Sequence, residues 1–382
     1  MSRKFLAIMM LGFMLVSVSV TAAQGTKAET SPFPAPSGPY KVGTVLRQWT
    51  DSTRDEPFTP DTSDKRELLV QLWYPADSQA SGAFAPYMSA SDQTLTVFEA
   101  LINGSHDLQL ALPHDKFAAY LSHAYADAAL ATDQPSYPVL VFSPGFTATP
   151  SMYTVQLEEL ASQGYIIAAI NYTYGSAVTA FPDGRTVMIN PQFNASSNFP
   201  VWVQDQVFVI NQLEALNASD PDKRFIGKLD LKHLGLFGHS LGGGVALKVG
   251  LLDSRVSAIL SEDSPPLGSR IDKSLPQAVM LMESEHNLGA NDAAYQQAKG
   301  AIYHLAMGGF EHDNFADFSL WPGIAPLKTV SSLGEVDPVR SFKIVNTYAL
   351  AFFDKYLKGK PETLLDGPSP DFKEVTIQSQ NK

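Results

Sequence analysis

The sequence predicts an α/β protein in which a mostly parallel central sheet carries helices on both faces. Short, nearly continuous apolar runs alternate with amphipathic helical patterns over residues 137–359. Such alternation is typical of parallel strands that are buried on both sides. The composition agrees with a large core, since 45% of the 382 residues are hydrophobic and only 17% are charged.

Two strands are expected ahead of this alternating region. The runs KVGTVLRQW (41–49) and ELLVQLWYP (67–75) are separated by a polar, turn-rich stretch, which favours a hairpin. Residues 81–134 carry apolar helical patterns and are predicted to form a helical insertion over the sheet. The main domain is therefore expected to span 40–360, followed by a polar C-terminal tail at 361–382.

The alternating region supplies the strands and helices of the expected sheet. A small Asp-Gly hairpin at 179–189 interrupts it. The last predicted helix, 339–359, ends before a proline. The strands are expected at 137–145, 165–174, 233–238, 256–261, 277–283 and 301–307, and the other helices at 151–164, 202–216, after Ser240, and at 291–299.

The N-terminus has the pattern of a secretory signal. Arg3 and Lys4 precede an apolar stretch at 5–20, and small residues follow it. This stretch is short for a membrane span, so we expect residues 1–23 to be cleaved and the protein to be secreted, to the periplasm or the medium, without a stable span. Residues 24–39, rich in Pro, Gly and Ser, are expected to be an extended leader.

Charge and cysteine content exclude several classes of partner. The net charge is −12, from 27 basic and 39 acidic residues, and becomes −14 without Arg3 and Lys4. Such a surface repels phosphate backbones, so we expect no nucleic-acid partner. The chain has no cysteine, which excludes disulfides and cysteine-based metal sites.

One motif carries chemistry. In LFGHSLGGGVAL (236–247), Ser240 lies between an apolar strand and the start of a helix. Gly238 and Gly242 complete GxSxG and remove the bulk that would crowd a sharp turn. One interpretation is that Ser240 only caps the N-terminus of the following helix with its hydroxyl. The strand-turn-helix context instead favours the nucleophile elbow of the α/β-hydrolase fold.

A nucleophilic serine needs a base, and the chain order of α/β-hydrolases places the histidine last. His286, His304 and His312 follow Ser240, whereas His239 adjoins the serine and is expected to point elsewhere. His304 lies inside a predicted strand and His286 directly after one. His312 follows the last strand in a Gly-led loop, so it is the predicted base.

The spacing of residues along the chain does not decide which carboxylate orients this base. Asp263 ends the first strand after Ser240. Glu283 and Glu285 lie at the end of the second strand, which is the commonest position for the acid.

The oxyanion hole needs two backbone NH groups. One is expected from Leu241, the residue after the nucleophile. In the stretch that follows LVFS (140–143), Pro144 has no NH and Gly145 permits the bend, which leaves Phe146 as the second donor. Because backbone donors supply the charge stabilisation, we expect no metal, no calcium and no other cofactor.

These segments together resemble the plasma-type platelet-activating factor acetylhydrolase family, the secreted group VII phospholipases A2. The resemblance covers roughly 38–357 and includes LWYP, VLVFSPGF, GHSLGGG, LPQAVMLMESE and the distinctive HDNFADF. It implies that His312 is the catalytic histidine and Asp263 the catalytic acid. The chain departs from the animal members at Pro144, where they have histidine, and in the insertion at 81–134.

The resemblance implies a secreted serine esterase that cleaves short acyl esters through an acyl-enzyme. The expected partner is a small-molecule or lipid ester, foremost a platelet-activating factor-like or oxidised phospholipid cut at its sn-2 ester. A general carboxylesterase or a polyester hydrolase is the alternative. A serine peptidase and a non-catalytic binding protein of the same fold are the rival classes.

Overall fold

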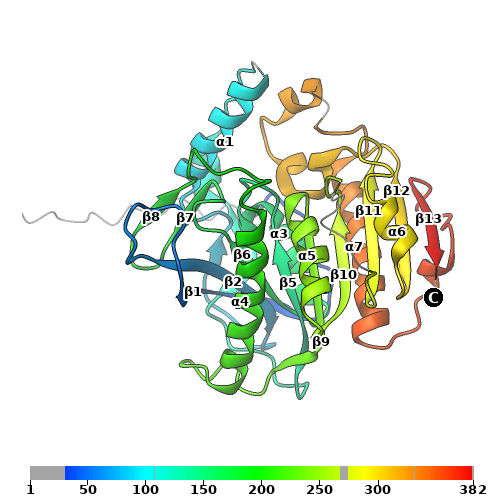
Figure 1. Ribbon diagram of the computed structural model, residues 1–382, viewed down its shortest axis with the longest axis horizontal. Helices are drawn as coiled ribbons and strands as arrows, with labels where there is room; N and C mark the ends of the chain where they lie inside the picture. The colour runs from blue at the N-terminus through cyan, green and yellow to red at the C-terminus, as the bar shows by residue number, and fades with distance from the viewer. Residues whose placement is uncertain (1–30, 107, 267–273, 331, 381–382) are drawn as a thin grey trace, which may run out of the picture.

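The computed structural model describes residues 31–106, 108–266, 274–330 and 332–380 (Figure 1). The signal peptide expected at 1–23 lies outside these residues. Within these residues, eleven strands form one sheet, in the order β13-β12-β11-β10-β9-β5-β6-β2-β1-β4-β3. None of the described helices is both long and apolar enough to cross a bilayer.

The centre of the sheet is parallel, because its strands are buried on both faces and joined by helical crossovers. In β5, for example, every residue but Pro138 is buried. The parallel strands are β6 (Ile166–Asn171), β5 (Tyr137–Ser143), β9 (Leu229–His239), β10 (Val256–Glu262), β11 (Ala278–Ser284) and β12 (Ile302–Met307).

Antiparallel strands flank this centre. The predicted hairpin is confirmed as β1 (Lys41–Asp55) paired with β2 (Lys65–Ala76), and β2 also pairs with β6. The second predicted hairpin is confirmed as β7 (Val178–Ala180) and β8 (Thr186–Met188), outside the main sheet.

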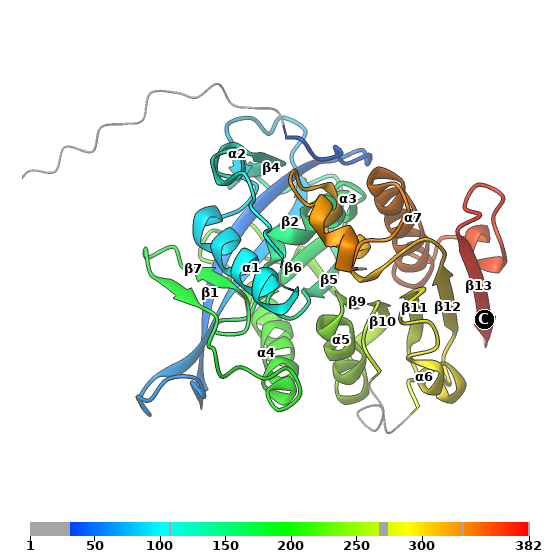
Figure 2. The same ribbon diagram turned by 90° about the horizontal axis from the view of Figure 1, so that it is seen from above.

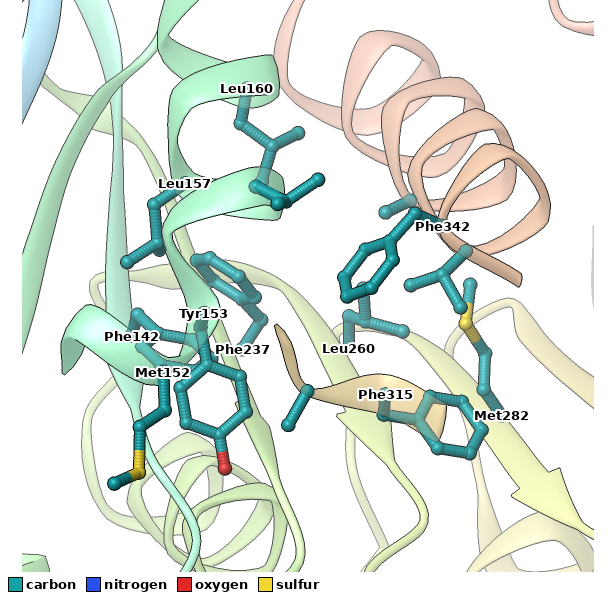
Figure 3. Close-up of a cluster of buried hydrophobic side chains, with 14 of the residues drawn as sticks. Phe142, Met152, Tyr153, Leu157, Leu160, Phe237, Leu260, Met282, Phe315 and Phe342 are labelled. Atoms are coloured by element: carbon teal, nitrogen blue, oxygen red, sulfur yellow. The ribbon is translucent and has the colours of Figure 1, made fainter. Parts of the chain in front are cut away.

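Helices cover both faces, which confirms the predicted α/β-hydrolase class (Figure 2). One face carries α3 (Thr154–Ser162) and α7 (Pro338–Leu357). The other carries α4 (Phe199–Ala218), α5 (Leu241–Leu252) and α6 (Asp292–Gln297). Figure 3 shows part of the apolar layer between the sheet and the first pair of helices, where Phe142 and Phe237 of the sheet pack 4.7 Å apart, ring centroid to ring centroid.

The insertion at 81–134 is only partly helical. It contains α1 (Ser91–His106) and α2 (His114–Ala119), but the helical pattern expected to continue past 119 is wrong. Residues Leu121–Ala126 form β4, which pairs with β1 and with β3 (Phe84–Pro86). Ser122 and Ala124 are buried while their neighbours are not, and this period of two decides for a strand.

The first and last segments of the described chain pack more tightly than the sequence indicated. Residues 31–39, the described part of the leader, contain no helix or strand, yet Phe33 is buried and stacks on Tyr87 with ring centroids 4.1 Å apart. Ser37 bonds the carboxylate of Glu159 on α3 through its NH and its hydroxyl, both at 2.7 Å. In the tail expected at 361–382, Val375–Gln380 forms β13, an edge strand antiparallel to β12.

A buried ion network fixes the hairpin to α4. The guanidinium of Arg66, on β2, donates to Asp205 of α4 at 2.7 Å and to Glu56 at 3.0 Å. It also donates to the carbonyl of Thr173 at 2.9 Å. Arg66 and Asp205 have no exposed surface, so water does not hydrate these charges and they are stabilised by one another.

Candidate active site

Ser240 lies on a sharp turn between β9 and α5. Its φ of +54° and ψ of −126° lie in a region that residues with side chains rarely adopt. A Cβ at Gly238 or Gly242 would collide with the carbonyl of Ser143 on the neighbouring strand. The Ser240 NH donates to the carbonyl of Glu262 at 2.8 Å. The two glycines and this bond hold the serine hydroxyl clear of the sheet.

Three side chains from separate elements meet at this turn. His312 begins a short 3-10 helix, His312–Phe315, after β12. Its Nε2 lies 2.9 Å from Ser240 Oγ, and its Nδ1 lies 2.6 Å from Asp263 Oδ2. Because a carboxylate only accepts, Nδ1 carries the proton and Nε2 is free to accept from the serine hydroxyl.

Asp263 is buried at the end of β10 and is held by further donors. Its Oδ1 accepts the NH of Ser284 and its Oδ2 accepts the side-chain amide of Asn287, both at 2.7 Å. Burial alone would raise the pKa of Asp263, but the hydrogen bond and charge of His312, together with the NH of Ser284, lower it. Sequence reasoning missed Asn287, since an amide in the loop after β11 gives no signal of the contact that it makes.

The other candidate acids and histidine lie elsewhere. Glu283 is buried and bonds His304 Nε2 at 2.8 Å and the NH of Gly289 at 2.7 Å. Glu285 accepts the NH of Gly309 at 2.8 Å. Neither glutamate has a described contact with the His312 ring, so the structure brings Asp263 to this histidine.

The electrostatics of His312 favour the positively charged ring, in which both nitrogens carry a proton. Burial would lower its pKa, but the bond to Asp263 and the charges of Asp313, Asp263 and Glu311 outweigh burial and raise it. The imidazole is only half-buried.

The expected oxyanion donors lie beside the serine. The NH of Gly145 donates to Tyr153 Oη at 3.1 Å, so it is already used. Within the described part of the chain, no hydrogen bond takes up the NH of Phe146 or of Leu241, the first residue of α5. Gly145 lies so near that a Cβ there would be 3.3 Å from Ser240 Cβ.

Metal-ligating atoms also gather here. Potential ligand atoms of His239, Asp263 and His312 lie within 4.8 Å of one another. Both nitrogens of His239 are already hydrogen-bonded, to Tyr153 Oη and to the carbonyl of His312. The donor set is therefore committed to one network, and the expectation that no metal takes part stays a prediction.

The family model of "Platelet-activating factor acetylhydrolase, isoform II" matches residues 25–205 and 210–365 of the chain. The chain belongs to this family. A family relative described as "Probable 1-alkyl-2-acetylglycerophosphocholine esterase", from Arthroderma benhamiae, is 26% identical over 375 residues, covering 90% of this chain and 93% of its own. The platelet-activating factor acetylhydrolase of Cavia porcellus is 26% identical over 259 residues, 58% of either chain.

A solved structure, the ferulic acid esterase from Streptomyces cinnamoneus, superimposes on this platelet-activating factor acetylhydrolase family member with a TM-score of 0.74. It is 28% identical and covers 92% of this chain and 99% of its own. The chain is therefore a carboxylic ester hydrolase of the α/β-hydrolase type.

Proposed function

We propose that Ser240, His312 and Asp263 form the catalytic triad of this ester hydrolase. The observation that carries the proposal is the continuous chain of hydrogen bonds from Asp263 Oδ2 through His312 to Ser240 Oγ, at 2.6 and 2.9 Å. This arrangement supports two-step acyl transfer. The NH groups of Phe146 and Leu241 have no described hydrogen-bond partner, which supports their role as oxyanion donors.

In the first step, Ser240 Oγ attacks the ester carbonyl while its proton passes to His312 Nε2. The carbonyl oxygen becomes an oxyanion that accepts from the NH groups of Phe146 and Leu241. His312 then gives the proton to the departing alcohol, and the acyl group stays on Ser240. Asp263 keeps the ring oriented and stabilises its positive form.

In the second step, His312 takes a proton from water, and the resulting hydroxide equivalent attacks the acyl carbonyl. The tetrahedral intermediate collapses, Ser240 recovers its proton from His312, and the acid is released. The two steps use only groups of this chain, the substrate and one water molecule.

We propose a short or oxidised sn-2 acyl chain of a phospholipid as the substrate, released by a secreted enzyme. The names of the Arthroderma and Cavia relatives support the acetyl ester. In Ser240→Ala we expect p-nitrophenyl acetate turnover and organophosphate labelling to be lost, and we expect the Tm to equal that of the parent. Retained turnover in that variant would remove Ser240 from the mechanism.

A second substrate class is favoured by one feature of the site. The ring of Phe146 is 37% exposed and stacks on Phe193 with centroids 5.3 Å apart, which offers an aromatic surface beside the serine. The solved neighbour is a ferulic acid esterase. A panel of acetyl to palmitoyl phospholipids beside feruloyl and p-nitrophenyl esters separates the two classes. A higher kcat/KM for feruloyl esters than for sn-2 acetyl phospholipids would overturn the phospholipid assignment.

A further inference from the structure

A buried chain of hydrogen bonds runs beneath the triad and joins two of its loops. The NH of Gly145 donates to Tyr153 Oη at 3.1 Å. Tyr153 Oη lies 2.9 Å from His239 Nδ1, and His239 Nε2 lies 2.9 Å from the carbonyl oxygen of His312. Tyr153 and His239 are 1% and 2% exposed, so water does not compete for these bonds.

The two ends of this chain fix the direction of every link. The carbonyl of His312 can only accept, so His239 Nε2 carries a proton and donates. In a neutral imidazole the other nitrogen accepts, so Tyr153 donates its hydroxyl proton to Nδ1. The tyrosine oxygen is then left to accept from the NH of Gly145. All donors and acceptors of the chain are matched only while His239 is neutral.

The surroundings keep His239 neutral. Burial, together with the charge of His312, lowers the pKa of His239 to about 3. Burial likewise raises the pKa of Tyr153, so its hydroxyl keeps the proton that it donates. The order of donors and acceptors therefore holds across the pH range in which an esterase works.

Packing leaves this chain little freedom. Figure 3 shows Tyr153 at the edge of the apolar cluster, beside Met152, with its hydroxyl pointing away from the apolar side chains. The rings of His239 and His312 lie 4.5 Å apart, centroid to centroid. A Cβ at Gly145 would lie 3.2 Å from Tyr153 Oη and 3.3 Å from His239 Nδ1. Any side chain at 145 would crowd both links.

We propose that Tyr153 and His239 are positioning residues that set the distance between the oxyanion donor Phe146 and the base His312. Tyr153 accepts the NH of Gly145, the residue before Phe146, and His239 donates to the backbone carbonyl of His312 itself. This inference rests on the proposed roles of Phe146 and His312. Neither positioning residue touches the substrate, so they act on the rate of acylation through geometry.

Three variants separate the links of the chain. Tyr153→Phe removes only the hydroxyl. His239→Leu removes both bonds of the imidazole, while His239→Gln keeps an amide NH that can reach the carbonyl of His312. We expect kcat for p-nitrophenyl acetate to fall about 10- to 100-fold in Tyr153→Phe and in His239→Leu, with KM unchanged, because a misplacement of about 1 Å costs about 100-fold. His239→Gln should recover most of the loss.

A double-mutant cycle tests whether the links act as one unit. If they do, Tyr153→Phe combined with His239→Leu should have the kcat of His239→Leu alone, since the chain is already broken. Losses that multiply would overturn a joint action. Tyr153→Phe carries the test if the His239 variants do not fold.

Matched controls come from buried groups outside the site. His304 bonds Glu283 at 2.8 Å and Tyr165 bonds Asp354 at 2.7 Å, both in buried positions. His304→Leu and Tyr165→Phe should lower Tm without lowering kcat. If they lower kcat as much, or if Tyr153→Phe and His239→Leu stay within twofold of the parent, the positioning role is wrong. Activity in Ser240→Ala would instead overturn the triad itself.

Discussion

At the scale of single residues, Asp263 is the group whose removal is most informative. Asp263→Asn keeps the shape but loses the acceptor that fixes the proton on His312 Nδ1, so we expect kcat to fall on the order of 10³- to 10⁴-fold. Glu283→Gln should leave kcat nearly unchanged, because Glu283 bonds His304 rather than His312. Steady-state rates on p-nitrophenyl acetate rank the two. The reverse ranking would move the acid to β11.

The charge next to His312 should appear in the pH profile. His312 accepts the serine proton only when neutral, and burial is outweighed by Asp263, Asp313 and Glu311, which raise its pKa. Asp313→Asn removes one of these charges, so kcat/KM should reach its plateau at lower pH than in the parent. Asp183→Asn, in the β7–β8 hairpin, is the control. An unmoved or upward-shifted acid limb in Asp313→Asn would contradict this account.

At the scale of secondary-structure elements, the Arg66 network decides whether β2 stays docked on α4. Arg66→Met leaves the buried Glu56 without a cation and Asp205 with Arg54 alone, and the loss of one partner of a buried ion pair costs about 3–5 kcal/mol. The free energy of unfolding in urea measures the loss. Arg185→Met is the matched control: the side chain of Arg185 is half-exposed, so its pairs with Asp183 and Glu67 should each contribute under about 1 kcal/mol. Equal losses in the two variants would contradict the role assigned to burial.

The same scale shows what the sequence could predict. Continuous apolar runs located the parallel strands, because burial on both faces leaves few polar positions in them. The helix predicted over residues 121–126 was wrong. These residues form a short strand that is stabilised by its pairing with β1, and their apolar content suits a helix as well as a strand. β13 was missed for a similar reason: Val375–Gln380 is a polar edge strand that only its neighbour, β12, reveals.

The site was predictable to a similar extent. Motif and chain order nominated Ser240 and His312, whose side chains the structure brings within 2.9 Å. Spacing could not choose the acid, because β10 and β11 are adjacent parallel strands that end at the same edge of the sheet. The link from His239 to Tyr153 depends on how α3 and the preceding turn pack on β9, and no local pattern in the sequence reports that packing.

At the scale of the whole molecule, one buried carboxyl group should make the free energy of unfolding fall as the pH rises. Glu262 has no exposed surface, and its described side-chain contact is the amide of Gln156 at 2.6 Å from Oε1. Burial raises its pKa to about 8. The folded protein then keeps a proton that the unfolded chain releases above about pH 4, so each unit of pH between these values favours unfolding.

Glu262→Gln isolates this effect, because glutamine has the same shape and cannot ionise. The free energy of unfolding of the variant should match that of the parent near pH 4. Above pH 4, it should exceed the parent's free energy of unfolding by a margin that grows up to about pH 8 and then stays constant. Burial also raises the pKa of Asp317 to about 8, but Asp317 is present in both proteins, so its effect on stability cancels in the comparison. The overall negative charge differs by at most one, so general repulsion cancels in the comparison. Urea unfolding at pH 4, 6 and 8 measures the margin. A margin that does not change with pH would mean that Glu262 is ionised in the fold and that a donor reaches its Oε2.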